Sequence, residues 1–381
     1  MHPALTEAEL PALIQQVLWA GLLLGALFGA IAQRTHFCTM GAVADIVNMG
    51  DWSRMSMWLV AIATGALGFN AMVALGLVQA RHSIYAAANW LPLSNLAGGA
   101  LFGFGMVLAS GCGSKTLVRI GGGSLKALVV FAVLSIASYA TLRGVVAVAR
   151  VATVDAAVVR LPVGQDLPSL LAASASAAGL GLGPARALAL PLAVLLVLAV
   201  LAFVARRPEG RRNETWLGGI GIGAAVVGGW WVTGHLGHLV EHPLTLEEAF
   251  VGTQGGRMES LTFVAPIAYT VDWLILFSDK SRVLTFGIVT TLGVVLGSAA
   301  VALAQRSFRW EGFASTEDTA NHLVGAVLMG VGGVTALGCT VGQGLTGIST
   351  LALGSFVALA GILGGAVAAL RYQVWRLERV G

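Results

Sequence analysis

Residues 96–112 of this chain read LAGGALFGFGMVLASGC, and residues 323–339 read LVGAVLMGVGGVTALGC. Aligned on their final cysteines, Cys112 and Cys339, the two stretches are identical at nine of seventeen positions. Each stretch is apolar, carries glycines at matching places and is followed by a Gly/Ser/Thr-rich segment and a further apolar run. The repeat therefore predicts two related halves, each with an apolar helix that breaks at a Gly-Cys pair.

The composition indicates a membrane protein. Hydrophobic residues make up 57% of the chain and charged residues 10%, whereas an ordinary globular domain has about 25% charged residues. With a mean hydropathy of +0.84, the chain has too little polar surface to cover itself, so its solvent is largely lipid. The formal charge of +4 comes without a basic run interleaved with aromatic residues, which argues against nucleic-acid binding. The N-terminus lacks a basic n-region, so we expect no cleaved signal peptide.

Long apolar runs indicate an all-α polytopic membrane protein with about nine transmembrane helices, since about 20 apolar residues cross a bilayer. They lie near 12–32, 55–78, 94–111, 124–143, 187–205, 214–232, 283–304, 321–338 and 350–370. Four further apolar segments are short or interrupted, near 35–50, 112–123, 258–278 and 339–349. Backbone polar groups cannot face lipid unpaired, and these segments are rich in Gly, Ser and Thr. We therefore expect four short re-entrant helices.

The order of the segments predicts two inverted halves. Half-repeats 12–143 and 214–371 are separated by one connecting helix, 187–205, and an odd connector turns the second half upside down relative to the first. The basic loop Arg206–Arg212 is expected in the cytoplasm. The N-terminus is then periplasmic and the C-terminus cytoplasmic. We interpret 144–186 as an outer loop without chemistry.

The chain has three cysteines, Cys38, Cys112 and Cys339. The number is odd, and there is no C-x-x-C pair, zinc-type Cys/His spacing or disulfide framework. Cys112 and Cys339 occupy equivalent helix breaks, whereas alignment of the halves puts Leu261 opposite Cys38. A free cysteine is commonly a small buried hydrophobe. A pair at equivalent breaks, with a third on another broken segment, also suits a binding site.

A site built from such thiols suits a particular class of ligand. An ordinary thiol, with a pKa of about 8.5, is mostly protonated at neutral pH and is then a weak S–H donor and a soft contact. Helix starts and free backbone N–H groups attract anions. Together they suit an anion that carries a soft sulfur or selenium atom. The predicted substrate-binding residues are Cys38, Thr39, Gly111, Cys112, Gly113, Gly338, Cys339 and Thr340.

Charged residues near the broken segments have two interpretations each. Lys115, Arg119 and Lys126 follow Cys112 and either anchor the inner membrane face or attract an anion. Asp45 and Asp272 lie in corresponding broken segments. They either cap helices or mark proton or sodium coupling.

Two further patterns are assigned structural roles. His235, His238 and His242 would share one helical face beside Glu241, and we favour interfacial polar residues there over a metal site. Small residues at regular spacing in membrane helices usually mediate close packing. We assign that role to Gly98, Gly103, Gly105, Gly325, Gly330 and Gly332.

At its cysteine motifs the chain resembles the YeeE/YedE sulfur-transport family, the thiosulfate permeases of bacterial inner membranes. The matching elements are the segment His36-Phe-Cys38-Thr, the Gly111-Cys112 turn and residues 338–350, which read GCTVGQGLTGIST. The similarity covers nearly the whole chain apart from 144–186. The residues after Cys112 depart from those after Cys339, so the two cysteines need not bind alike.

The resemblance implies two inverted helical halves around a narrow central constriction. It also implies uptake of thiosulfate, which Cys38, Cys112 and Cys339 pass along by S–H···S contacts. A small cytoplasmic sulfurtransferase of the TusA type is the implied partner. Some relatives are linked to selenium metabolism, so a selenium-containing compound is an alternative substrate.

We therefore predict a thiosulfate permease of the bacterial inner membrane, with no enzymatic activity, cofactor or metal. The glycines of Gly219-Ile-Gly-Ile-Gly223 follow no strand and form no nucleotide-binding loop. One alternative is a membrane thiol or sulfurtransferase enzyme that forms persulfides on its cysteines, although it would need a thiol of low pKa and a resolving partner. The other is a structural partner of a membrane complex.

Overall fold

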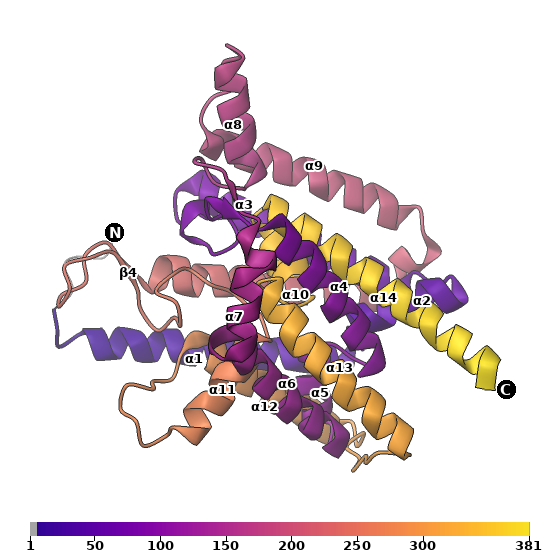
Figure 1. The fold of residues 1–381 in the computed structure, drawn as a ribbon. Coiled ribbons are helices and arrows are strands. Elements are labelled where there is room, and N and C mark those ends of the chain that lie inside the picture. The colour runs from indigo at the N-terminus through magenta and orange to yellow at the C-terminus, as the bar shows by residue number, and fades with distance from the viewer. Residues whose placement is uncertain (1–5, 381) are drawn as a thin grey trace.

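The computed structural model describes residues 6–380 and is almost entirely helical (Figure 1). The helices of the first half are α1 (Leu10–Arg34), α2 (Thr39–Met49), α3 (Ser53–Leu75), α4 (Pro92–Leu108), α5 (Gly113–Gly121) and α6 (Leu125–Arg143). Those of the second half are α10 (Asn213–Trp231), α11 (Ala265–Ile275), α12 (Phe286–Ala304), α13 (Thr316–Thr335), the π-helical turn η5 (Gly342–Gly347) and α14 (Leu353–Val380). Between them lie α7 (Val145–Ala152), α8 (Leu167–Ala177) and α9 (Ala185–Ala205).

Short elements complete the part of the chain that is described. Two antiparallel strand pairs join β1 (Asn89–Trp90) to β2 (Val159–Arg160) and β3 (His238–Leu239) to β4 (Ala249–Phe250). Single turns of helix are η1 (Ala80–His82), η2 (Val154–Ala156), η3 (Pro208–Arg211) and the π turn η4 (Val232–Leu236).

The prediction of an all-α polytopic membrane protein is confirmed, with one difference in the number of clear spans. Within residues 6–380, eight helical segments are long and apolar enough to cross a membrane. The ninth expected span, 321–338, corresponds to α13, which has 20 residues. Helix α13 begins earlier than predicted, and its first turn contains the charged residues Glu317 and Asp318. The four interrupted segments correspond to α2, α5, α11 and η5.

Equivalent helices of the two halves cross in opposite directions. Where α4 meets α13, Gly98 lies against Gly332 and Gly105 lies against Gly325. These four glycines are equivalent in pairs in the repeated sequence, Gly98 with Gly325 and Gly105 with Gly332. Replacing each glycine by its equivalent in the other half therefore turns one of these two contacts into the other. Because the two equivalent helices run antiparallel, the axis that relates the halves is perpendicular to them, as in an inverted repeat.

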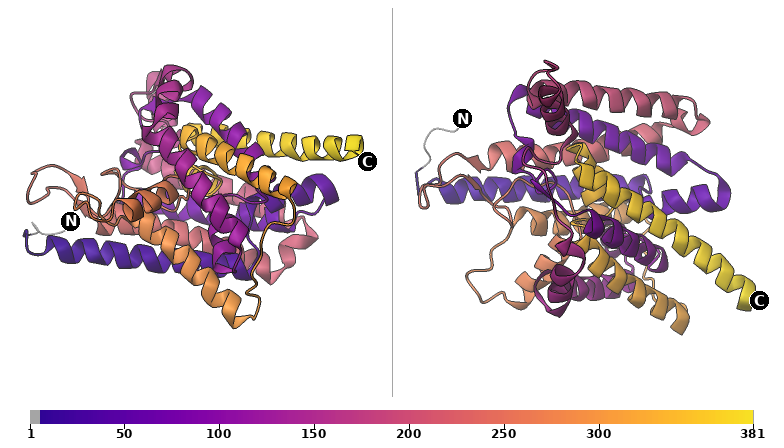
Figure 2. Two further views of the ribbon diagram at one scale, coloured as in Figure 1. Left: turned by 60° about the horizontal axis from the view of Figure 1, so that its bottom comes forward. Right: turned by 45° about the horizontal axis from the view of Figure 1, so that its top comes forward.

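The other contacts between long helices also occur in equivalent pairs, one in each half. Helix α1 packs on α12 as α10 packs on α3, and α4 packs on α14 as α13 packs on α6. Both views in Figure 2 show α1 beginning at the left end of the molecule and α14 finishing at the right end. Helix α9 lies at the edge of the bundle, where it packs along α3.

An ion pair recurs at the end of the first short helix of each half. In the first half, Arg54 Nε lies 2.5 Å from Asp45 Oδ2. In the second, Arg282 Nη1 lies 3.3 Å from Asp272 Oδ2. The sequence left two interpretations open for these acids, helix capping and ion coupling. In the structure each acid binds an arginine that precedes or begins the next long helix.

Candidate functional site

All three cysteines follow the same kind of helix end. His36, Ser110 and Leu337 have left-handed backbones, with φ of 54°, 54° and 61°. In each case the next N–H donates to a carbonyl five residues back: Phe37 to Ala32, Gly111 to Met106 and Gly338 to Gly333. This is the Schellman helix end, which usually has glycine at the left-handed position. A residue with a side chain costs roughly 1–2 kcal/mol there, so the surrounding structure must hold each turn in place.

Each cysteine then lies at the start of a short helix. Cys38 caps α2, and its Sγ accepts the Gly41 N–H at 3.3 Å. Cys339 precedes η5, and its Sγ accepts the Gly342 N–H at 3.4 Å. Cys112 caps α5, and its Sγ lies 3.3 Å from Ser114 Oγ. The first N–H groups of a helix lack partners inside it and carry partial positive charge. The three thiols therefore sit where an anion is favoured.

The three thiols are buried within the protein and do not face lipid. Cys38, Cys112 and Cys339 are 6%, 1% and 0% exposed. Cys112 and Cys339 belong to one hydrophobic core, as does Phe37, the neighbour of Cys38. The aromatic rings of Phe28 and Phe263, with centroids 5.2 Å apart, belong to the same core. The structure thus brings cysteine-bearing segments that are up to 301 positions apart in the sequence into one buried core.

The remaining predicted site residues are also buried beside the thiols. Thr39 begins α2 and is 1% exposed. Gly111 packs against the Lys115 side chain, Gly113 lies against Phe263, and Gly338 lies against Gln343. A Cβ would come within 3.1 Å of a neighbouring atom at Gly111 and Gly338, whereas at Gly113 it would make an ordinary contact at 3.4 Å.

Thr340 differs from the other buried threonines of the centre. It is fully buried, and its Oγ1 has no hydrogen-bond partner among the described residues. In contrast, Thr346 Oγ1 donates to the Leu261 carbonyl at 2.6 Å. A buried hydroxyl without a partner costs about 1–3 kcal/mol. The hydroxyl next to Cys339 is therefore available to a ligand.

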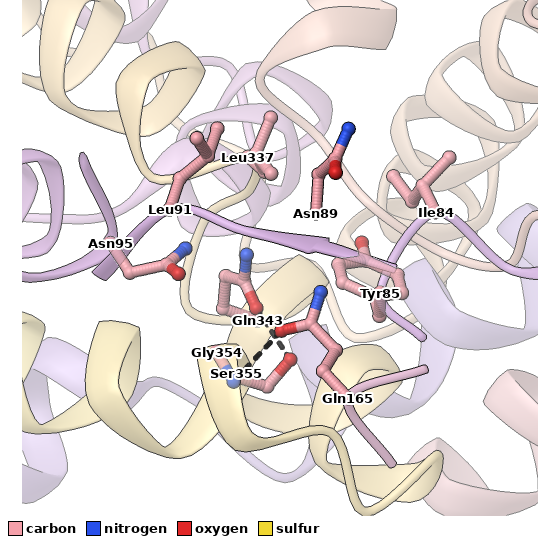
Figure 3. A pocket seen from close by; sticks show the side chains of 10 residues that line it. All are labelled: Ile84, Tyr85, Asn89, Leu91, Asn95, Gln165, Leu337, Gln343, Gly354 and Ser355. Carbon is pink, nitrogen blue, oxygen red and sulfur yellow. Dashed lines mark hydrogen bonds between the residues drawn. The ribbon is translucent and has the colours of Figure 1, made fainter. Parts of the chain in front are cut away.

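A small polar cavity adjoins Cys339 (Figure 3). Its volume is about 10 Å³, room for roughly one water molecule. Gln343 forms part of the wall, and its backbone N–H donates to the Cys339 carbonyl at 2.7 Å. The Tyr85 hydroxyl, also in the wall, lies beside Gly342, whose N–H donates to Cys339 Sγ. The lining residues are Ile84, Tyr85, Asn89, Leu91, Asn95, Gln165, Leu337, Gln343, Gly354 and Ser355.

Segment 144–186, which the sequence predicted to be an outer loop without chemistry, contributes one residue to the wall of this cavity. Gln165 lines the cavity, and its Oε1 accepts the Gly354 N–H at 3.2 Å. Strand β2 in this segment pairs with β1, and the Leu167 N–H donates to the Leu351 carbonyl at 3.0 Å. The segment lacks a recognisable motif because its contribution is a single amide side chain and backbone pairing. Sequence reasoning also missed Tyr85 and Asn95, for which isolated polar residues were the only signal. Gln343 lies within the quoted motif 338–350, although it was not named as a site residue.

Two of the three cations after Cys112, Lys126 and Lys115, have different environments. Lys126 Nζ lies 2.9 Å from Glu311 Oε1 and 3.6 Å from Asp318 Oδ2, so it is an anchoring residue. Lys115 is half-buried, and its side chain packs against Gly111, the neighbour of Cys112. Within residues 6–380 no carboxylate lies within 4.0 Å of its Nζ. A half-buried ammonium without a carboxylate is costly unless an anion is bound, which favours the anion-attracting interpretation for Lys115.

The predicted helical face of histidines is wrong. The helix that carries His235 ends at Leu236, and His238 lies in β3. His235 Nδ1 lies 3.3 Å from the Leu77 carbonyl, and His242 Nδ1 accepts the Leu244 N–H. His238 Nε2 instead lies 2.7 Å from Glu248 Oε1. His82, which is distant in the sequence, lies beside these two residues.

The fold and the buried thiols define a multi-pass helical membrane protein with a central cysteine site between two inverted halves. A family model described as sulphur transport matches residues 34–368. The chain therefore belongs to the sulphur transport family.

Individual relatives cover most of the chain. It is 28% identical over 336 residues to the thiosulfate transporter TsuA of Escherichia coli (strain K12), covering 86% of each protein. It is 27% identical over 352 residues to the thiosulfate transporter TsuA of Spirochaeta thermophila, covering 90% of this chain and 94% of the relative. A shorter match, 30% identical over 112 residues, relates 29% of this chain to 26% of the probable transporter YedE of E. coli K12.

Proposed function

We propose that this protein is a permease that takes up thiosulfate across the bacterial inner membrane. The half-repeats are 12–143 and 214–371, with the N-terminus periplasmic and the C-terminus cytoplasmic. The observation that carries the proposal is the set of three buried thiols, each at a helix start that follows a left-handed turn. Membership of the sulphur transport family and the names of two relatives support the substrate.

Thiosulfate matches both chemical features of the site. Its oxygens are hard acceptors for backbone N–H groups, and its terminal sulfur is a soft acceptor for thiol S–H groups. A neutral thiol can donate a proton in a weak hydrogen bond without forming a covalent bond. Each contact is weak, so the ion can bind and leave again. Sulfate presents only oxygens and should bind less well.

The order of the thiols along the path follows from their neighbours. Gln343 lines the polar cavity, and its backbone N–H donates to the Cys339 carbonyl. Cys112 belongs to the same core as Cys339. Arg54 packs against Gly41, whose N–H donates to Cys38 Sγ. On the proposed topology the cavity is periplasmic. Thiosulfate would therefore meet Cys339 first, Cys112 next and Cys38 last. A cytoplasmic sulfurtransferase of the TusA type would then receive it.

Two experiments distinguish the proposal from its alternatives. Mass measurement of the purified protein after incubation with thiosulfate should show no added sulfur, because passage leaves the thiols unchanged. A stable persulfide on Cys38, Cys112 or Cys339 would indicate an enzyme instead. Uptake of labelled thiosulfate into proteoliposomes, with sulfate and selenium oxyanions as competitors, tests the substrate. Strong inhibition by sulfate would contradict selection by soft sulfur.

A further inference from the structure

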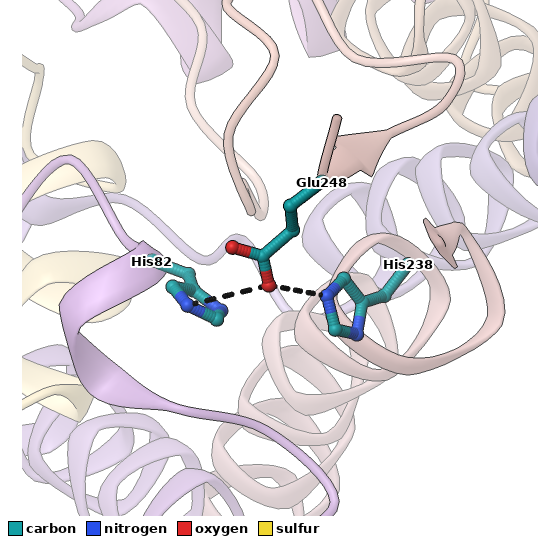
Figure 4. A group of neighbouring side chains, drawn as sticks. All are labelled: His82, His238 and Glu248. Carbon is teal, nitrogen blue, oxygen red and sulfur yellow. Dashed lines mark hydrogen bonds and ion pairs between the residues drawn. The ribbon is translucent and has the colours of Figure 1, made fainter. Parts of the chain in front are cut away.

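We infer that His82, His238 and Glu248 form a binding site for a divalent transition metal such as Zn²⁺ at the proposed periplasmic end (Figure 4). Their three ligand atoms all lie within 4.8 Å of one another. Glu248 Oε1 is 2.7 Å from His238 Nε2 and 3.6 Å from His82 Nε2. Figure 4 shows the carboxylate reaching between the two imidazole rings. The site is separate from the cysteine centre and does not depend on the proposed transport function.

The geometry suits zinc after small side-chain movements. Zn–N and Zn–O bonds are about 2.0–2.2 Å, so neighbouring ligand atoms in a tetrahedral site are about 3.3 Å apart. The two measured separations, 2.7 and 3.6 Å, lie on either side of that value. Two imidazoles and one carboxylate are a common zinc ligand set that leaves a fourth position for water.

The two imidazoles are held by packing. The His238 ring stacks on Phe250, with centroids 4.8 Å apart and planes at 16°. The His82 ring meets the edge of the same phenylalanine, with centroids 5.3 Å apart. Phe250 is 7% exposed, and His238 pairs with it across the β3–β4 ladder. Such support fixes ligand orientation before a metal binds. Glu248 is more exposed and can adjust its position.

A metal here would connect the two halves of the protein. His82 lies between α3 and α4, whereas His238 and Glu248 follow α10. The neighbouring Ser83 forms a β-bridge with Met258, and Tyr85 lines the polar cavity beside Cys339. The ion would therefore brace the loops around the proposed entrance and stabilise the folded protein, since a ligand that binds only the native state raises its stability.

The test uses the full chain, purified without a histidine tag, freed of metal by chelation and kept in detergent. Equilibrium dialysis against Zn²⁺ should give one bound ion per chain, and Co²⁺ should give the visible absorption of a tetrahedral site. Zn²⁺ should also raise Tm. His82→Gln, His238→Gln and Glu248→Gln should each weaken Zn²⁺ binding by at least about tenfold.

Matched controls use histidines close to the site but outside the cluster. His235→Gln and His242→Gln should bind Zn²⁺ like the unmodified protein. Each variant is first checked for an unchanged Tm in the metal-free form, and because the three ligands lie on different segments the conclusion does not depend on one variant. The site would be overturned if the unmodified protein did not bind Zn²⁺, or if all three ligand variants bound Zn²⁺ as tightly as the unmodified protein. Glu248 would then be an ion-pair partner only.

Discussion

At the scale of single residues, the centre is defined by groups that have no protein partner. Thr340 Oγ1 is buried without a hydrogen bond, and Lys115, which packs beside Cys112 at Gly111, has no carboxylate partner among residues 6–380. Structural residues normally satisfy such groups internally. Groups left unsatisfied next to cysteines at helix starts are those that a ligand can satisfy. Changing them should therefore affect transport more than stability.

Thr340→Val tests this for the hydroxyl. Valine has nearly the same shape, so the folded protein loses only a hydroxyl that bonds to nothing, and Tm should stay the same or rise. If the hydroxyl binds thiosulfate, losing a hydrogen bond to an anion, worth about 1.5–3 kcal/mol, should lower the uptake rate at low substrate concentration by about ten- to a hundredfold. The control is Thr346→Val, which removes a bonded hydroxyl and should lower Tm. Normal uptake by Thr340→Val would exclude the contact.

Lys115→Gln tests the ammonium. Removing the charge should raise the transport KM for thiosulfate by about tenfold, equal to about 1.4 kcal/mol, and Lys115→Arg should restore part of the affinity. Concentration dependence of uptake gives the KM. Lys126→Gln is the matched control because Lys126 is already paired with Glu311 and Asp318. If both glutamine variants have an unchanged KM, Lys115 is an anchoring residue as well.

At the scale of elements, glycine allows helices of the two halves to approach backbone to backbone. A Cβ at Gly103 would collide with the carbonyl oxygen of Ile362, where α4 packs on α14. A Cβ at Gly98 or Gly105 would likewise collide with backbone atoms of α13 or of the residue that follows it. These contacts confirm the packing role predicted for those glycines. They also fix the antiparallel crossing of α4 and α13, and so the positions of the helix ends that lead to Cys112 and Cys339.

Gly103→Ala should therefore lower the Tm of the purified protein, because overpacking at a backbone contact costs about 1–3 kcal/mol. Gly364→Ala is the control on the partner helix, since nothing lies within 4 Å of a Cβ there. It should leave Tm unchanged or raise it, as alanine favours helix over glycine by up to about 1 kcal/mol. Thermal unfolding in detergent compares the two. Equal Tm values would show that the α4–α14 contact tolerates a side chain.

At the scale of the whole molecule, the repeat made much of the architecture predictable. The identical glycines and the Gly-Cys ends of 96–112 and 323–339 predicted the two helix breaks, and the odd connector predicted inversion. The left-handed turns at Ser110 and Leu337 were not predictable, because neither position is glycine. The contacts of Gln165 with the cavity and of His82 with His238 were also missed, since they join distant segments and no local pattern marks them.

The most direct test of the central claim is the initial rate of labelled thiosulfate uptake into proteoliposomes that contain equal amounts of folded protein. If thiosulfate passes along three buried thiols, Cys38→Ser, Cys112→Ser and Cys339→Ser should each lower the rate by about tenfold or more, since each removes one soft contact from a single path. Rates within about twofold of the unmodified protein for all three variants would contradict the account.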